Sequence, residues 1–176
     1  MTEHLRNIAL VGHGGSGKTS LAEALLYNAG VLKRFGSVDE GNSAMDFEPE
    51  ELKRRSSIST AFHRFPWKKH QVNLIDTPGD QNFFSDTRLC MQAADGVVLV
   101  IDAIDGVKVK SEQAWEFADE FNLPRLIFIN KLDRERADFY KAFDDAAAIF
   151  SPRPIRLQLP IGQESDFKGV VDLSNL

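Results

Sequence analysis

The segment GHGGSGKTS, residues 12–20, limits the possible folds of this chain more than any other stretch. It follows the apolar run NIALV and satisfies the pattern G-x-x-x-x-G-K-[ST]. Glycines let the backbone wrap around an anion, N–H groups at a helix start attract phosphate, and a lysine placed here reaches the β and γ phosphate oxygens. A glycine-rich turn with an incidental lysine is the alternative. The position between a strand and a helix favours a phosphate-binding loop.

This interpretation assigns roles to the individual residues of the loop. The Lys18 ammonium is a predicted catalytic group, and the Thr19 hydroxyl is expected to bind Mg²⁺. For His13, a nucleotide contact and an exposed loop histidine are equally good interpretations. The predicted nucleotide-binding residues of the loop are His13, Gly14, Gly15, Ser16, Gly17, Lys18, Thr19 and Ser20.

Short apolar runs alternate with stretches of helical period along the rest of the chain. The runs predict buried strands at residues 7–11, 72–75, 96–101 and 125–129. The periodic stretches predict helices at residues 18–28, 83–92, 110–121 and 138–150. Together with the phosphate loop, this alternation predicts an α/β fold of the three-layer P-loop NTPase type, a mostly parallel sheet with helices on both faces. The site should lie at the carboxyl ends of the strands.

Three other stretches have weaker patterns. Residues 30–60 have no sustained period and many charges, which predicts either a mobile functional loop or partial disorder. The sequence PWKK between His63 and His70 predicts a turn between two strands, and a solvated hairpin end is favoured over an RNA contact. After Pro152, the sequence predicts a short strand, a turn and the start of another strand.

The sequence IDTPGDQNF closes an apolar run with a second group of polar residues. An aspartate at a strand end, here Asp76, is placed to hold Mg²⁺, and the N–H of Gly79 could approach a γ-phosphate. A simple turn with proline at its second position is the alternative, but the order after Lys18 favours the metal interpretation. Asp80 follows where a hydrolytic water would be held. It is therefore the second predicted catalytic residue.

The run NKLD, residues 130–133, predicts which base is bound. A carboxylate in the base plane, here Asp133, accepts from both N1–H and the 2-amino group of guanine, whereas adenine has an acceptor at N1 and no 2-amino group. Asn130 and Lys131 complete the predicted base site, with the aliphatic stem of Lys131 over the base. The alternative role for Asp133 is an ordinary helix N-cap. An enzyme that uses ATP is disfavoured, because adenine would leave the carboxylate unpaired.

In this order, the motifs resemble those of the translational GTPases, and within them the elongation factor G family. The similar stretches are GHGGSGKTS, MDFEPEELKRRSSIST, NLIDTPGDQNF, ADGVVLVIDAIDGVKVKSEQAW and PRLIFINKLDRERAD. The tail RPIRLQLPIGQESDFKGVVDL resembles the start of an insert found in elongation factor G and its ribosome-protection relatives. The resemblance implies that residues 1–151 form the GTP-binding core and that residues 152–176 begin this insert, with the fifth guanine-binding loop beyond Leu176.

The resemblance also implies a function. GTP and GDP would be the ligands and Mg²⁺ the cofactor, and the full-length protein would hydrolyse GTP on the ribosome to drive conformational switching in translation elongation. A GTP-dependent ribosome-binding module with little or no hydrolysis is one alternative, and a ribosome-protection factor is another. The implied partners are ribosomal RNA and ribosomal proteins.

Three positions depart from the family pattern. The family's first switch has an R-G-I-T-like stretch whose threonine binds Mg²⁺, and here the aligned residue is Ser57, for which an exposed loop serine is an equally good interpretation. Gly15 stands where the family usually has aspartate. Asp80 replaces a histidine that orients the hydrolytic water. In the glycine-rich loop and the missing histidine, the chain resembles the divergent elongation factor G-like paralogues more than the main factor.

The replacement at Asp80 predicts slow hydrolysis. A carboxylate can hold water by accepting its hydrogen bond, but the γ-phosphate oxygens repel it, and it gives nothing to the developing negative charge. The alternative is that Asp80 points into solvent and caps the helix that begins near residue 83.

Composition narrows the partners and the compartment. A net charge of −5 and a pI near 5.4 argue against broad attraction to DNA or to an anionic membrane. The single cysteine, Cys90, permits no internal disulfide, as expected in a reducing compartment. The pattern at the start of the given sequence predicts neither a signal peptide nor a membrane span. We therefore expect a cytoplasmic protein, with this part of it monomeric.

Overall fold

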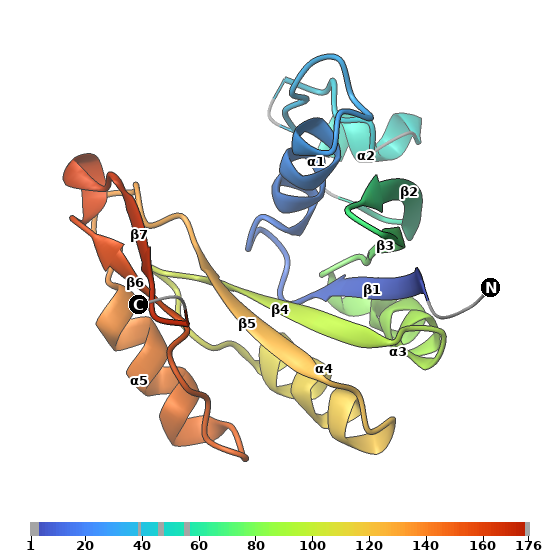
Figure 1. The fold of residues 1–176 in the computed structure, drawn as a ribbon. Helices are drawn as coiled ribbons and strands as arrows, with labels where there is room; N and C mark the ends of the chain where they lie inside the picture. The colour runs from blue at the N-terminus through green and yellow to red at the C-terminus, as the bar shows by residue number, and fades with distance from the viewer. Residues whose placement is uncertain (1–3, 39, 46–47, 55–56, 175–176) are drawn as a thin grey trace.

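The computed structural model describes residues 4–38, 40–45, 48–54 and 57–174. Its centre is a five-stranded sheet with the order β2-β3-β1-β4-β5 (Figure 1). β1, β3, β4 and β5 are parallel, whereas β2 runs antiparallel to β3. The mostly parallel α/β sheet is confirmed, and each predicted strand lies within an observed one. The strands are β1 (Leu5–Val11), β2 (Ala61–Trp67), β3 (His70–Asp76), β4 (Gly96–Asp102) and β5 (Arg125–Asn130).

Helices cover both faces of this sheet, because successive strand residues point to opposite sides. Leu10 and Leu74 pack in one core with Leu26 of α1. Val11 and Leu99, which point the other way, pack in a second core with residues of α3, α4 and α5. The predicted helices agree with the observed ones to within one residue at each end. The helices are α1 (Lys18–Asn28), α3 (Phe84–Gln92), α4 (Val109–Glu120) and α5 (Phe139–Ile149), and a short 3₁₀ helix, η2 (Gln81–Phe83), precedes α3.

The segment between α1 and β2 has more structure than its sequence suggests. It contains the helix α2 (Pro49–Arg54), a regular element in a stretch whose sequence has no sustained period. Two buried carboxylates organise its described residues. Glu23 of α1 accepts from Gly36 N (3.2 Å), Ser43 Oγ (2.8 Å) and Ala44 N. Buried acceptors of this kind fix backbone N–H groups that would otherwise have to find water.

Glu51 is the second of these carboxylates and is 1% exposed. It accepts from the backbone N–H groups of Glu48 (3.0 Å), Ile58 (2.8 Å) and Ser59 (2.9 Å). The carboxylate therefore joins the start of α2 to the chain that leads into β2.

Two hairpins complete the fold. β2 and β3 are joined at Lys68 and Lys69, as the PWKK turn predicted, and Lys68 has a φ of 51°. A separate two-stranded sheet follows α5, formed by β6 (Gln158–Ile161) and β7 (Gly169–Asp172), with the 3₁₀ helix η3 (Glu164–Asp166) between them. The predicted strand, turn and strand after Pro152 are thus confirmed. None of the helices in the described part of the chain is long and apolar enough to cross a membrane.

Candidate functional site: a phosphate loop joined to a base-reading loop

The phosphate loop joins β1 to α1 and depends on glycine at two positions. Gly12 has a φ of 140°, and a Cβ there would lie 2.4 Å from the carbonyl oxygen of Val100 in β4. Gly17 has a φ of 94°, and a Cβ there would lie 2.2 Å from Asn130 Nδ2. Any side chain would be strained and would collide at both places. Gly14 and Gly15 are exposed at the top of the loop, Ser20 is exposed on the first turn of α1, and Ser16 is buried.

Lys18 is folded back onto this loop. It is 6% exposed, and its Nζ donates to the carbonyl oxygens of Gly12 (3.1 Å) and His13 (2.9 Å). Burial lowers the pKa of Lys18 to about 8, although the nearby Asp76 carboxylate raises it. The ammonium is therefore held by two neutral carbonyl oxygens at the place where phosphate oxygens are expected.

His13 is buried inside the loop, 4% exposed, so the interpretation as an exposed loop histidine is wrong. Burial, together with the positive charges of Lys108 and Lys18, lowers its pKa to about 4. Its Nε2 lies 3.8 Å from Asp105 Oδ2, too far for a hydrogen bond, and neither ring nitrogen has a hydrogen-bond partner among the described residues. The ring is therefore neutral near pH 7.

Three oxygen-bearing side chains converge beside Lys18. Thr19 Oγ1 donates to Asp76 Oδ2 at 2.8 Å and lies 3.0 Å from Ser57 Oγ. Ser57 is half-buried by this contact, which argues against an exposed loop serine. Its neighbours Arg55 and Ser56 lie outside the described residues. One carboxylate and two hydroxyls are hard oxygen donors of the type that Mg²⁺ prefers, so the set fits the ion predicted there.

The DTPG turn lies against the phosphate loop. A Cβ on Gly79 would lie 2.5 Å from both Gly14 N and Lys18 Nζ, so only glycine fits. Asp80 is exposed, and its carboxylate accepts from Asn82 N at 2.9 Å as the N-cap of η2. The geometry favours the capping interpretation of Asp80, in a 3₁₀ turn that leads into α3. Its catalytic role stays a prediction.

The NKLD run is bonded directly to the phosphate loop. Asn130 Nδ2 donates to the carbonyl oxygen of Ser16 at 2.9 Å. Lys131 Nζ donates to the carbonyl oxygen of Gly15 and to Asp102 Oδ2, the latter at 2.7 Å. The two predicted sites, for phosphate and for base, are thus one continuous structure at the carboxyl ends of β1, β4 and β5.

Asp133 is exposed in the turn after β5 and is not a helix cap, so that alternative is wrong. The N-cap of α5 is Asp138, whose carboxylate accepts from Lys141 N at 3.0 Å. The Asp133 side chain stands on the same loop as Lys131. This position is compatible with a contact to a base.

Asp102, the last residue of β4, is part of the site although the motifs did not include it. Burial alone would raise the pKa of Asp102, but hydrogen bonds from Lys131 and from Ile104 N outweigh burial and hold the pKa below its usual range. The sequence could have indicated Asp102 as a site residue, since it ends an apolar strand as Asp76 does. The Asp102 carboxylate accepts from Lys131 Nζ and so fixes the position of that side chain.

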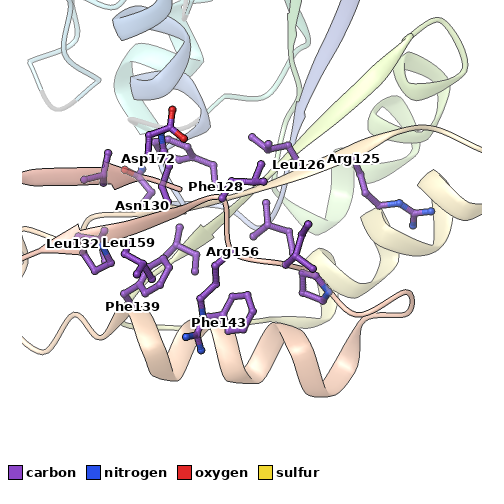
Figure 2. Close-up of a pocket in the computed structure, with 18 of the residues that line it drawn as sticks. Arg125, Leu126, Phe128, Asn130, Leu132, Phe139, Phe143, Arg156, Leu159 and Asp172 are labelled. Atoms are coloured by element: carbon purple, nitrogen blue, oxygen red, sulfur yellow. The ribbon is translucent and has the colours of Figure 1, made fainter. Parts of the chain in front are cut away.

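A groove of about 790 Å³ begins at residues 130–136, the predicted base-reading loop, and runs along β5 (Figure 2). Leu126 and Phe128 of β5 line one side, and they are 44% and 36% exposed. Phe143 of α5 and Arg156 line the other side, where the Arg156 guanidinium lies 4.2 Å from the centre of the Phe143 ring. The groove is mainly apolar, unlike the polar loop at its end.

Comparison with known proteins agrees with this geometry. Residues 3–170 match the family model described as the elongation factor Tu GTP binding domain. Elongation factor G of Granulibacter bethesdensis is 43% identical over 171 residues, which cover 97% of this chain and 25% of that protein. Elongation factor G 2 of Borreliella afzelii is 39% identical over 169 residues, which cover 96% of this chain and 25% of that protein. The chain thus spans about a quarter of the length of these relatives.

Comparison with solved structures agrees with the sequence comparisons. The crystal structure of ttk003000868 from Thermus thermophilus superposes with a TM-score of 0.89 at 36% identity, covering 95% of this chain and 25% of that one. The chain therefore belongs to the elongation factor Tu GTP-binding domain family, with elongation factor G proteins among its relatives.

Proposed function

We propose that this chain is the GTP-binding part of a translational GTPase that hydrolyses GTP to GDP with Mg²⁺ on the ribosome. The observation that carries the proposal is the bonding of Asn130 and Lys131 to the carbonyl oxygens of Ser16 and Gly15. It supports one ligand that has both a guanine base and a phosphate chain. The relatives' name, elongation factor G, supports a role in translation elongation.

The proposed binding roles follow the chain's own groups. The backbone of residues 13–17 and the Lys18 ammonium bind the phosphates, and Asp133 accepts from guanine N1–H and the 2-amino group. Thr19, Ser57 and Asp76 hold Mg²⁺, which when bound neutralises charge on the phosphate oxygens. The convergence of these three side chains, with Thr19 within hydrogen-bond distance of both others, supports this assignment.

Asp80 makes slow hydrolysis part of the proposal. Its carboxylate already caps Asn82 N and brings no positive charge or donor toward a γ-phosphate. The same observation favours the second candidate, a GTP-dependent ribosome ligand with negligible hydrolysis. The two candidates differ in turnover and not in affinity.

The wider setting is also proposed. Residues 1–151 would form the GTP-binding core and residues 152–176 the start of the insert. The ribosome would be reached through the full-length protein, which we expect to be cytoplasmic, and we expect the part described here to be monomeric. GTP would order the segments 30–60 and 79–84, and hydrolysis would release them.

Single-turnover cleavage of γ-labelled GTP by the full-length protein, with and without ribosomes, tests the proposal. We expect slow cleavage alone and faster cleavage with ribosomes. GTP binding without cleavage in either condition would establish the second candidate. Excess ATP should not displace bound GTP, and displacement by ATP would contradict both candidates.

An Asp80→His variant sharpens the same experiment. A histidine can donate a proton and orient water without repelling the phosphate, so we expect faster ribosome-dependent cleavage than in the wild type. An Asp80→Ala variant serves as the control, because it removes the cap and the charge without supplying a donor. A histidine variant that cleaves GTP no faster than the wild type would show that Asp80 does not limit hydrolysis. Equal rates in the histidine and alanine variants, both above the wild type, would show that the carboxylate alone slows the reaction.

A further inference from the structure

The turn between β6 and β7 is bonded to both sides of Asp133. Glu164, the first residue of η3, donates its backbone N–H to the carbonyl oxygen of Leu132 at 3.0 Å. Its Oε1 accepts from the backbone N–H of Arg136 at 2.8 Å. Residue 133 therefore lies on a short loop whose two flanks are tied to a single glutamate.

The backbone at these contacts has an unusual conformation. Glu164 has a φ of 49° and Arg136 a φ of 65°, which L residues other than glycine rarely adopt. Gly162, two residues before Glu164, has a φ of 80°, and a Cβ there would lie 2.0 Å from the carbonyl oxygen of Asp166. Such backbone persists when surrounding contacts determine it, and it is often found at functional sites.

We propose that Glu164 is a positioning residue for guanine specificity. It holds the loop of Asp133 so that the Asp133 carboxylate meets N1–H and the 2-amino group of guanine together. Asn130 and Lys131 are already fixed by the phosphate loop and Asp102, whereas Glu164 acts on the far half of the base-reading loop. This gives the β6–β7 hairpin a function in the choice of base. The inference rests on the proposed contact between Asp133 and guanine.

Inosine diphosphate (IDP) is the probe that distinguishes a role of Glu164 in the choice of base from a role in the stability of the loop alone. IDP keeps N1–H and the diphosphate of GDP but lacks the 2-amino group. A displaced Asp133 loses two contacts with GDP and one with IDP, so GDP affinity should fall more. The affinities of both nucleotides are measured by competition against a fluorescent GDP on the full-length protein.

Three variants are compared for their affinity for GDP and for their preference for GDP over IDP. In Glu164→Ala, GDP should bind roughly tenfold more weakly and the preference for GDP over IDP should fall toward one, because a charged hydrogen bond to the loop is lost. In Glu164→Gln, the amide oxygen can still accept from Arg136 N and should restore most of the preference. The matched control is Asp166→Ala, which removes the same charge from an exposed position in the same turn and should leave the preference unchanged.

Each other outcome has a defined meaning. Equal weakening of GDP and IDP in Glu164→Ala, no weakening at all, or the same loss in Asp166→Ala would overturn the inference while the proposed function stands. An unchanged preference in Asp133→Ala would overturn the proposed guanine contact, and the inference with it. In the double variant, Glu164→Ala should cause no further loss of the preference for GDP over IDP beyond that of Asp133→Ala. Fully additive losses of this preference would overturn the inference.

Amide hydrogen exchange on the wild-type protein tests the inference even if Glu164→Ala does not fold. In the wild type, the Arg136 amide should exchange slowly, because its acceptor is the Glu164 carboxylate. Fast exchange of this amide in the folded wild type would overturn the inference.

Discussion

The ammonium group of Lys131 lies 2.7 Å from the carboxylate of Asp102, where it also reaches the carbonyl oxygen of Gly15. Asp102 is 4% exposed and ends β4, whereas Lys131 follows β5 and has a φ of 63°. The ion pair therefore joins two neighbouring strand ends and orients a lysine whose stem is expected to cover the base.

Loss of the Asp102 charge should loosen this arrangement. In Asp102→Asn we expect GDP to bind about tenfold more weakly, about 1.4 kcal/mol, since the carboxylate that pairs with the Lys131 ammonium is replaced by a neutral amide. Isothermal titration with GDP measures the change. Asp119→Asn is the control, because Asp119 pairs with Arg125 at the opposite end of β5 and is half-exposed. Equal affinities in Asp102→Asn and the wild type would refute the role of the ion pair.

Nucleotide affinity should fall as the pH rises above about 8. The pKa of Lys18 is lowered to about 8 by burial, and bound phosphates favour the charged ammonium. Above that pH the free protein has lost the proton that the complex retains, so binding must take one up and the Kd of GDP should rise by up to about tenfold per pH unit. Equilibrium titrations between about pH 7 and 9 measure this. Lys18→Arg stays charged throughout and should give a Kd that is less dependent on pH.

Stability should decrease in mild acid because of His13. Its pKa is lowered from 6.5 to about 4 by burial, so between these values the unfolded chain binds a proton that the folded protein excludes. The free energy of unfolding should thus be highest above pH 6.5 and lose about 3 kcal/mol by pH 4 through this residue. Urea unfolding at several pH values measures the slope. His13→Asn should flatten it, and an unchanged slope in this variant would contradict the role of His13.

Glu51 should contribute far more to stability than its neighbour Glu50. Glu51→Gln puts an amide donor among three backbone N–H groups, so we expect a loss of about 2 kcal/mol in the free energy of unfolding. Glu50→Gln changes a 61% exposed carboxylate paired with Lys53 and should stay within about 0.5 kcal/mol of the wild type. Urea unfolding compares the two variants. Similar losses in the two variants would show that the buried hydrogen bonds of Glu51 contribute no more to the free energy of unfolding than the exposed ion pair of Glu50.

Much of the fold can be predicted from the sequence because its signals are local. The apolar strands and the periodic helices can be placed almost to the residue, since burial on both faces of a parallel sheet produces continuous apolar runs. The phosphate loop and NKLD can be placed because strand ends in such a sheet meet at one edge. The contacts of Asn130 and Lys131 with the phosphate loop are the structural result of that rule.

The buried carboxylates and the buried histidine are harder to predict. Glu23 lies three residues before Leu26 on the buried face of α1, and this spacing is a usable sign of burial. Glu51 has no such sign, because the run EPEELKRR looks like a solvated charged surface. The burial of His13 depends on contacts between distant segments, which single-sequence patterns do not contain. The cap at Asp138 is a local contact with Lys141 N, but Asp133 stands close by in the sequence and offers the same side chain.

The hydrogen bonds of Lys18 to Gly12 and His13 have a consequence for nucleotide exchange. If Lys18 binds the phosphates as proposed, it need not remain an uncompensated buried cation when a diphosphate leaves, because two carbonyl oxygens of the same loop accept its hydrogen bonds. Between one nucleotide and the next, the loop itself thus supplies a substitute for the ligand. Release and entry then become a competition for one ammonium group between the loop's own backbone and the incoming phosphate.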